Sequence, residues 1–346
     1  MPPSSIAAPL LAWYDAHQRV LPWRARPANS YHVLLSEFML QQTTVATVLN
    51  YFPRFIERFP DVNALAASPL EDVLSLWAGL GYYARARNLH KAAVAVVEHH
   101  HGRIPNTEAL LRQLPGVGAY TAAAIAAIAF DEPATVVDSN VERVMARLHN
   151  IDTPLPTAKK QLTQLAATHT PQRRPGCYAQ ALMDLGSRVC VSGVPRCGVC
   201  PIITSCAAQA LGTAATLPRK KPKTLRPTRH GTAFVLFRAH DDAVWLRPRP
   251  ASGMLGGMLE VPGTPWLEHD TADMAPAAYM PMAIPFTPLN KPVEHIFSHF
   301  RAVITVSTAR TDEIPPDAGA WYALDTVPTL ALPTVMKKIL KRSIAL

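Results

Sequence analysis

Apolar residues recur at helical spacing through most of the first 212 residues. Within residues 32–58, for example, Val45, Val48 and Phe52 fall on one helical face. The same pattern predicts further helices over residues 61–78, 84–101, 107–114, 120–130, 138–150, 158–169 and 177–188. Short breaks with glycine or proline separate them, and no strand pattern intervenes. Residues 1–212 are therefore predicted to form an all-α domain.

The pattern changes after residue 212. Residues 213–230 hold three prolines and six Lys or Arg residues with no acid among them, which is typical of a linker. Beyond it, apolar β-branched runs at 232–238, 244–247 and 302–307 predict strands. A short helix is predicted over 332–341. Residues 231–346 are therefore predicted to form a smaller α+β domain.

Composition and charge add a partner class to this division. The chain has 346 residues, of which 49% are hydrophobic, and Lys and Arg exceed Asp and Glu by 34 to 25. A basic balance favours nucleic acid or another anionic partner. No apolar run is long enough to span a bilayer, and the amino terminus lacks the charged start of a secretion signal. A cytoplasmic protein with no membrane partner is expected.

Four cysteines lie within 17 residues. Cys190, Cys197, Cys200 and Cys206 have the spacing C-x6-C-x2-C-x5-C, with glycines and prolines between them. Four thiolates this close can wrap one centre. Zinc and an iron–sulfur cluster both accept four thiolates, so the ligand type alone leaves both open.

Residues 114–122, LPGVGAYTA, place Gly116 and Gly118 between two predicted helices. Such a turn can aim backbone N–H groups at a phosphate, although a plain helix–helix turn has the same pattern. The three histidines at 99–101 precede Gly102, which favours a helix C-terminus over a metal site. Arg85, on the helix predicted over 84–101, is expected either on a solvated face or at a phosphate.

Two carboxylates are candidates for acid–base chemistry. Glu37 lies between Leu35 and Phe38, so it either faces solvent or occupies a closed pocket that would raise its pKa. Asp138 precedes a predicted helix and is expected to cap it as an anion. One protonated and one ionised carboxylate suit cleavage of a glycosidic bond through a cationic sugar.

The cysteine spacing and the hairpin resemble those of the endonuclease III superfamily of DNA glycosylases. The strings MLQQTTV, GLGYYARARNL, LPGVGAYTA and VVDSNVERV are similar to the MutY branch, the adenine DNA glycosylases, across essentially the entire helical half. The resemblance implies a helix-hairpin-helix glycosylase whose four cysteines hold a structural [4Fe–4S] cluster. It also implies base excision repair of adenine opposite 8-oxoguanine or guanine, leaving an abasic site.

The resemblance assigns roles to individual residues. Glu37 protonates the adenine, Asp138 stabilises the oxocarbenium-like intermediate, and Asn140 helps to place the attacking water. Tyr120 stands where bifunctional relatives carry a lysine. Because tyrosine cannot form an imine, strand cleavage is expected to be absent or weak.

Other residues are expected to contact DNA. Gln42 and Tyr82 match the residues that wedge beside the orphan base. The expected DNA contacts in the helical half are Gln41, Gln42, Thr43, Tyr82, Gly116, Gly118, Arg188 and Arg196. One departure is Glu142, where some relatives have a lysine.

The string LRPRPASGMLGGMLEVPGT resembles a MutT-like (Nudix) module. The chain after Gly263 lacks the glutamate-rich helix that Nudix hydrolysis needs, so no such hydrolysis is expected. Phe297, Ser298 and His299 match the element that contacts 8-oxoguanine, although ordinary packing at a strand end is the alternative. Leu255 and Leu259 stand where the family has tryptophans.

Three other functions compete with adenine excision. They are an endonuclease III-type glycosylase for damaged pyrimidines, a catalytically silent DNA-binding or redox-sensing protein, and a Nudix hydrolase with a helical appendage. Tyr120 argues against the pyrimidine glycosylase, and the missing glutamate-rich helix argues against the Nudix hydrolase. The presence of Glu37 and Asp138 argues against a catalytically silent protein. The expected protein is a nucleoid-associated monomer whose partner is double-stranded DNA with A:8-oxoguanine or A:G mispairs.

Overall fold

The computed structural model describes residues 6–222, 225–250, 253–268 and 276–344. Three predictions fall partly outside them, at residues 223–224 of the linker, 251–252 of the Nudix-like string and 269–275 of the segment after Gly263. The chain divides into two compact units. The first joins Met1–Ala67 to Asn88–Lys223, and the second joins Ser68–Arg87 to Thr224–Leu346. The domain boundaries at residues 212 and 230 stay a prediction. Among the described helices, none has the length and apolar character to cross a membrane.

The first unit is helical, as predicted. Its helices are α1 (Ala7–His17), α2 (Ser30–Leu40), α3 (Val45–Arg58), α4 (Val62–Ala67), most of α6 (Ala84–His100), α7 (Glu108–Leu111), α8 (Ala119–Phe130), α9 (Ser139–Leu148), α10 (Lys159–His169), α11 (Pro175–Arg188) and α12 (Ala207–Ala210). The single helix predicted over 32–58 is two helices. Gln42 turns the chain in a left-handed conformation with φ +60°, and the Thr44 side chain then caps α3.

Close helix packing fixes the centre of the first unit. A Cβ added to Gly176 would lie 2.2 Å from the Ala127 carbonyl oxygen, so α11 packs directly on the backbone of α8. A Cβ on Gly186 would lie 2.6 Å from Asn140 Cβ, so α11 also packs on the first turn of α9. Helix α8 packs in turn against α2. The middle of α2 and the first turns of α8 and α9 are thereby held together.

The predicted hairpin joins α7 to α8. Gly116 has φ +76°, and a Cβ there would lie 2.5 Å from Asn88 Cβ, so only glycine fits. Gly118 caps α8 without a side chain, and the space around it is open. The first N–H groups of α8 therefore have no side-chain cap.

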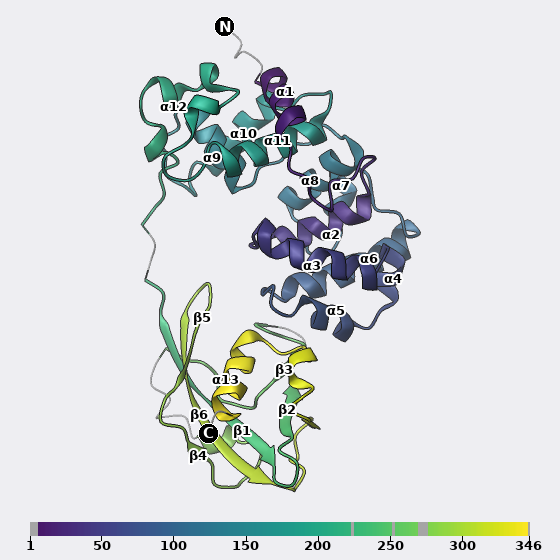
Figure 1. Cartoon of the computed structure of the whole chain (residues 1–346), viewed down its shortest axis with the longest axis vertical. Helices are drawn as coiled ribbons and strands as arrows, with labels where there is room; N and C mark the ends of the chain where they lie inside the picture. Colours follow the sequence, from purple (N-terminus) through teal and green to yellow (C-terminus); the bar gives the residue numbers. More distant parts are fainter. Residues whose placement is uncertain (1–5, 223–224, 251–252, 269–275, 345–346) are drawn as a thin grey trace. The chain divides into compact units, whose positions relative to one another are not determined.

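The second unit contains α5 (Leu70–Trp77) and a mixed sheet with one packed helix, which confirms the predicted α+β class. Its strands are β1 (Thr228–Arg238), β2 (Val244–Pro248), β3 (Leu259–Glu260), β4 (Thr287–Pro288), β5 (Val293–Ile296), β6 (Arg301–Thr311) and β7 (Ala320–Tyr322). The order is β3-β2-β1-β6-β4, with β5 paired to β6 and β7 to β2. Helix α13 (Thr334–Ile344) packs on the sheet through Val335, Met336, Ile339 and Leu340 (Figure 1).

Strands β1 and β6 are parallel over eleven residue pairs, from Thr228 with Arg301 to Arg238 with Thr311. Residues 297–300 form the turn between the antiparallel strands β5 and β6. The Arg301 N–H also donates to the Pro227 carbonyl at 3.0 Å. This turn therefore lies at the end of the sheet where the chain enters β1.

Candidate active site and cysteine loop

Glu37 lies in the interior and does not face solvent. Helix α2 is buried along nearly its whole length, and Glu37 is only 4% exposed. Loss of water raises the pKa of Glu37 to about 7, against smaller lowering effects from a Tyr120 hydrogen bond and the Arg24 charge. Among the described residues, its Oε2 atom has no hydrogen-bond partner. This carboxyl can therefore hold a proton near neutral pH and has a free oxygen.

Tyr120 and Asp138 lie close to Glu37. Tyr120 is the second residue of α8, and its hydroxyl is hydrogen-bonded to the Glu37 carboxyl. Burial and the nearby Glu37 and Asp138 charges hold the Tyr120 pKa well above its ordinary value, so the phenol stays a donor. The Asp138 charge in turn raises the Glu37 pKa. The structure thus brings together three side chains from α2, α8 and the start of α9.

Asp138 is the expected N-cap of α9. Its Oδ1 accepts the N–H groups of Asn140 at 2.9 Å and Val141 at 2.8 Å. Its Oδ2 accepts the Asn140 side-chain amide at 2.7 Å. Three donors hold this carboxylate in one orientation, which suits an anion beside a developing positive charge.

A chain of hydrogen bonds continues from Asn140 to the cysteine loop. Arg143 donates to Asn140 Oδ1 at 2.9 Å, to the Gly186 carbonyl at 2.6 Å and to the Cys190 carbonyl at 2.7 Å. Sequence reasoning missed Arg143. Its signal was the i, i+4 spacing with Arg147, which places both arginines on one face of α9.

Sequence reasoning also missed Arg24 and Asp184. Asp184, in α11, is fully buried and accepts two hydrogen bonds from the Arg24 guanidinium, at 2.8 and 3.0 Å. It also accepts two from Arg19, from the side chain at 2.7 Å and from the backbone N–H at 3.3 Å. Burial alone would raise the Asp184 pKa, but these arginines hold it below its usual range. Asp184 thus fixes Arg24, whose charge acts on Glu37. The partners are too far apart in sequence for a local pattern to reveal them.

The four clustered cysteines line one small cavity, together with Arg147. Arg147 is 1% exposed and donates to Cys190 Sγ at 3.3 Å and to the carbonyls of Val191, Gly193 and Leu217 at 2.8, 2.8 and 2.9 Å. It therefore ties α9 to the loop. In the described ranges, no group of three or more His, Cys, Asp or Glu side chains has the arrangement of a metal-ion site.

The expected DNA contacts of the first unit lie at its surface or near it. Gln41 donates to the Thr121 hydroxyl at 3.2 Å, and the Thr43 hydroxyl is within 3.5 Å of the Gln41 carbonyl. Gln42, between them, is exposed. Arg196 is exposed in the cysteine loop, and the exposed Arg188 donates to a carbonyl at 2.6 Å.

Tyr82 and the turn at 297–299 belong to the second unit. Tyr82 is 45% exposed and has φ +49°, and its hydroxyl is hydrogen-bonded to Ser298. Phe297 stacks on Phe300 with ring centroids 4.7 Å apart, whereas Ser298 and His299 are exposed. Phe297 therefore has a packing role, and the two polar side chains face outward.

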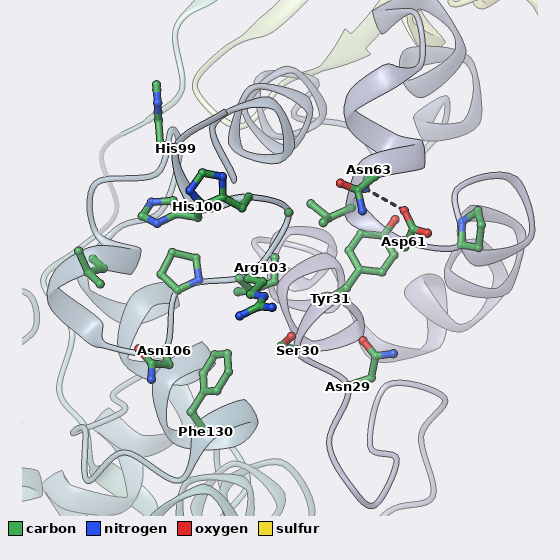
Figure 2. Close-up of a pocket in the computed structure, with 17 residues that line it drawn as sticks. Asn29, Ser30, Tyr31, Asp61, Asn63, His99, His100, Arg103, Asn106 and Phe130 are labelled. Carbon is green, nitrogen blue, oxygen red and sulfur yellow. Dashed lines mark hydrogen bonds between the residues drawn. The ribbon is translucent and has the colours of Figure 1, made fainter. Parts of the chain in front are cut away.

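A second cavity, of about 810 Å³, is separate from these carboxylates. It lies between the first turns of α2 and α4, the end of α6 and the loop that follows. Figure 2 shows Arg103 reaching into it, with His100 on one side and Ser30 on the other. Helix α6 ends at His100, and Gly102 has φ +73°. The histidine run is thus a helix C-terminus, as predicted.

Comparisons with known proteins agree with this arrangement. Residues 35–168 match the family model described as HhH-GPD superfamily base excision DNA repair protein, and residues 232–342 match the NUDIX domain model. The adenine DNA glycosylase of Mus musculus is 35% identical over 96% of this chain and 76% of its own length. That of Buchnera aphidicola is 30% identical over 96% of both chains. The chain belongs to the adenine DNA glycosylase family.

Solved structures agree on the fold of this family member. A thermostable thymine-DNA glycosylase is 27% identical with a TM-score of 0.53, covering 59% of this chain and 95% of its own. A non-covalent endonuclease III–DNA complex, 24% identical with a TM-score of 0.50, shares the fold. The expected helix-hairpin-helix glycosylase followed by a Nudix-like domain is confirmed. This adenine DNA glycosylase family member is a DNA glycosylase of base excision repair.

The Glu37 pKa has a consequence for stability. Its value of about 7 in the folded protein exceeds the ordinary 4.5, so the folded state binds a proton more tightly than the unfolded chain. Stability therefore falls as pH rises from about 4.5 to about 7. Glu37→Gln cannot ionise and should remove this loss, a gain of about 3 kcal/mol at pH 8 that shrinks toward pH 5. Urea unfolding across this range measures it, and a gain independent of pH would contradict the assignment.

Proposed function

We propose that this enzyme excises adenine from A:8-oxoguanine and A:G mispairs in double-stranded DNA, without strand cleavage, leaving an abasic site. Its named relatives support adenine as the base. The proposal rests on the buried Glu37, which has a free Oε2 atom and a pKa of about 7. Glu37 lies beside Asp138, the N-cap of α9. This is the pairing of acid and anion that glycosidic cleavage needs.

The first chemical step is protonation of the base. Adenine flips out of the duplex, at a lower cost from a mispair than from a normal pair. Glu37 then gives its proton to N7 of adenine, which turns the base into a leaving group. As the glycosidic bond breaks, the sugar gains positive charge, and the fixed Asp138 carboxylate stabilises it.

Hydrolysis completes the reaction. Glu37, now ionised, and Asn140 place a water molecule that attacks the sugar cation, and Glu37 takes up the proton that the water loses. The Tyr120 hydroxyl donates to Glu37 and so stabilises its anion after proton transfer. Because no lysine amine occupies position 120, the enzyme forms no Schiff base there and carries out no β-elimination through that residue.

The proposal assigns DNA contacts to the remaining predicted residues. The open first turn of α8, after Gly116 and Gly118, holds a phosphate through backbone N–H groups. Gln42 and Tyr82 wedge beside the orphan base. The basic segment 213–230 adds a salt-sensitive hold on the same duplex.

The opposite base is inspected by the C-terminal part of the chain. In this proposal residues 1–212 form the catalytic module, 213–230 the connector and 231–346 the recognition module. The exposed Ser298 and His299 contact the Hoogsteen edge, where 8-oxoguanine differs from guanine. Their position on a sharp turn beyond the packed Phe297 supports this role.

The enzyme also holds a [4Fe–4S] cluster in this proposal. Four half-buried thiols around one cavity, with a fully buried arginine donating to one of them, fit a four-thiolate group. The ligands are Cys190, Cys197, Cys200 and Cys206. When bound, the group would be held by these four thiolates and would cross-link the loop that carries Arg196, without taking part in the hydrolysis.

The chemistry is tested by the pH dependence of single-turnover excision from an A:8-oxoguanine duplex. Glu37 must be protonated to act, so the rate should be level below about pH 7 and fall about tenfold per unit above it. Strand breaks should appear only after alkali. Glu37→Gln should lose activity by about 10²-fold or more while it still binds the duplex. The exposed Glu57→Gln is the matched control, and an active Glu37→Gln would remove Glu37 from this role.

Recognition of the opposite base is tested by comparing A:8-oxoguanine with A:G duplexes. Ser298→Ala removes one hydrogen-bonding group, so the preference for 8-oxoguanine should fall by about fivefold, the effect of one neutral hydrogen bond. Thr305→Ala, an exposed change on β6, should leave the preference unchanged. If Ser298→Ala slows both duplexes equally, Ser298 does not discriminate between them.

The cofactor is tested on protein purified without oxygen. A [4Fe–4S] cluster should give broad visible absorption with iron and sulfide in equal amounts, and Cys200→Ser should lose most of it. Cys177→Ser, outside the four ligands, should keep the parent spectrum. Zinc in place of iron, with no visible absorption, would contradict the assignment.

A further inference from the structure

The segment 78–83 between α5 and α6 presents Tyr82 in an uncommon backbone conformation. Tyr82 has φ +49°, a region that side-chain-bearing residues rarely adopt, yet it is 45% exposed. The hydrogen bond between its hydroxyl and Ser298 holds the outer end of the ring and not the backbone. Something in the neighbouring structure must therefore fix it.

Arg85 provides this support. It was expected at a solvated face or a phosphate, but its side chain is only 6% exposed. One guanidinium nitrogen donates to the carbonyls of Leu80 at 3.1 Å and Gly81 at 3.0 Å, the two residues before Tyr82. The Arg85 backbone N–H also donates to the Tyr82 carbonyl, at 2.8 Å. Arg85 thus binds the backbone on both sides of the Tyr82 Cα.

Two aromatic rings flank the same guanidinium. Its carbon lies 5.2 Å from the Trp77 ring centroid and 5.5 Å from the Tyr82 ring centroid. Trp77 is fully buried and its indole N–H donates to the Gly81 carbonyl at 3.0 Å. Tyr82 is therefore connected through Arg85 to a ring that is buried and hydrogen-bonded. A planar cation can stack on both rings while donating to both carbonyls, whereas a lysine ammonium cannot.

We propose that Arg85 is a positioning residue for Tyr82, fixing the direction of its ring before DNA arrives. This inference rests on the proposed function, in which Tyr82 wedges into the duplex. A ring already held in place needs no ordering when it inserts, so the excision rate from bound DNA depends on Arg85 although Arg85 touches no base.

The position of the ring is tested without DNA. Protein labelled with 3-fluorotyrosine gives a ¹⁹F resonance for Tyr82, assigned by its absence in Tyr82→Leu. In Arg85→Lys and Arg85→Met this resonance should shift toward that of free fluorotyrosine. The exposed Arg103→Lys is the matched control and should leave it in place. Arg85→Lys keeps the charge, so it remains informative if Arg85→Met does not fold. A Tyr82 resonance that does not move in Arg85→Lys overturns the proposal.

The functional consequence is tested by a double-mutant cycle in single-turnover excision at saturating enzyme. Arg85→Lys should slow excision by tenfold or more in the parent but by less than twofold when Tyr82 is leucine. Equal losses of rate in both backgrounds would mean that Arg85 acts without Tyr82. A Tyr82→Leu variant that excises adenine as fast as the parent would mean that the position of the Tyr82 ring has no effect on excision. Either result overturns the proposal. If the parent excises no adenine, the proposed function fails, and the resonance alone decides the position of Tyr82.

Discussion

Removing the Glu37 carboxyl from water is the interaction on which the rest of the candidate site depends. Burial, helped by the nearby Asp138 charge, raises its pKa to about 7 against the lowering effects of the Tyr120 hydrogen bond and the Arg24 charge. That balance needs a helix buried on nearly all sides, and α2 is such a helix. The close approach of α11 to α8 at Gly176, and of α8 to α2, keeps water out of this region. The raised pKa of Glu37 thus depends on the packing of α11 on α8 as well as on the contacts of α2 itself.

Asp138 carries the same chemical group as Glu37 but has several hydrogen-bond donors around it. It is placed where backbone N–H groups converge, at the start of α9, and three hydrogen bonds satisfy it. These two environments lie close enough for the charges to interact. The two carboxyl groups therefore have different surroundings, because one lies in the middle of a buried helix and the other at a helix N-terminus.

Local patterns made the helices, the glycine hairpin, the Asp138 cap and the cysteine loop predictable, because each depends on residues within a few positions of one another. The break at Gln42 was missed because Phe38, Val45 and Phe52 keep helical spacing on either side of the polar residues 41–44, whereas the backbone turns there. Arg24 with Asp184 and Arg147 with the Leu217 carbonyl were missed because their partners are 160 and 70 positions apart. Arg85 was misjudged for a related reason: a charged residue in a helical pattern looks solvated until an aromatic ring covers it.

The parallel pairing of β1 with β6 has a mechanical consequence. Because Arg301 pairs with Thr228 and also bonds to Pro227, the turn at 297–300 sits where the chain enters the sheet. The backbone at Pro227, just before β1, is therefore joined by a hydrogen bond to the end of the turn that carries Ser298. A change in the length or stiffness of the segment that leads into β1 would therefore act directly on the turn at 297–300. Substitutions in the segment before β1 can therefore change the position of the turn at 297–300 while the sequence of the sheet stays the same.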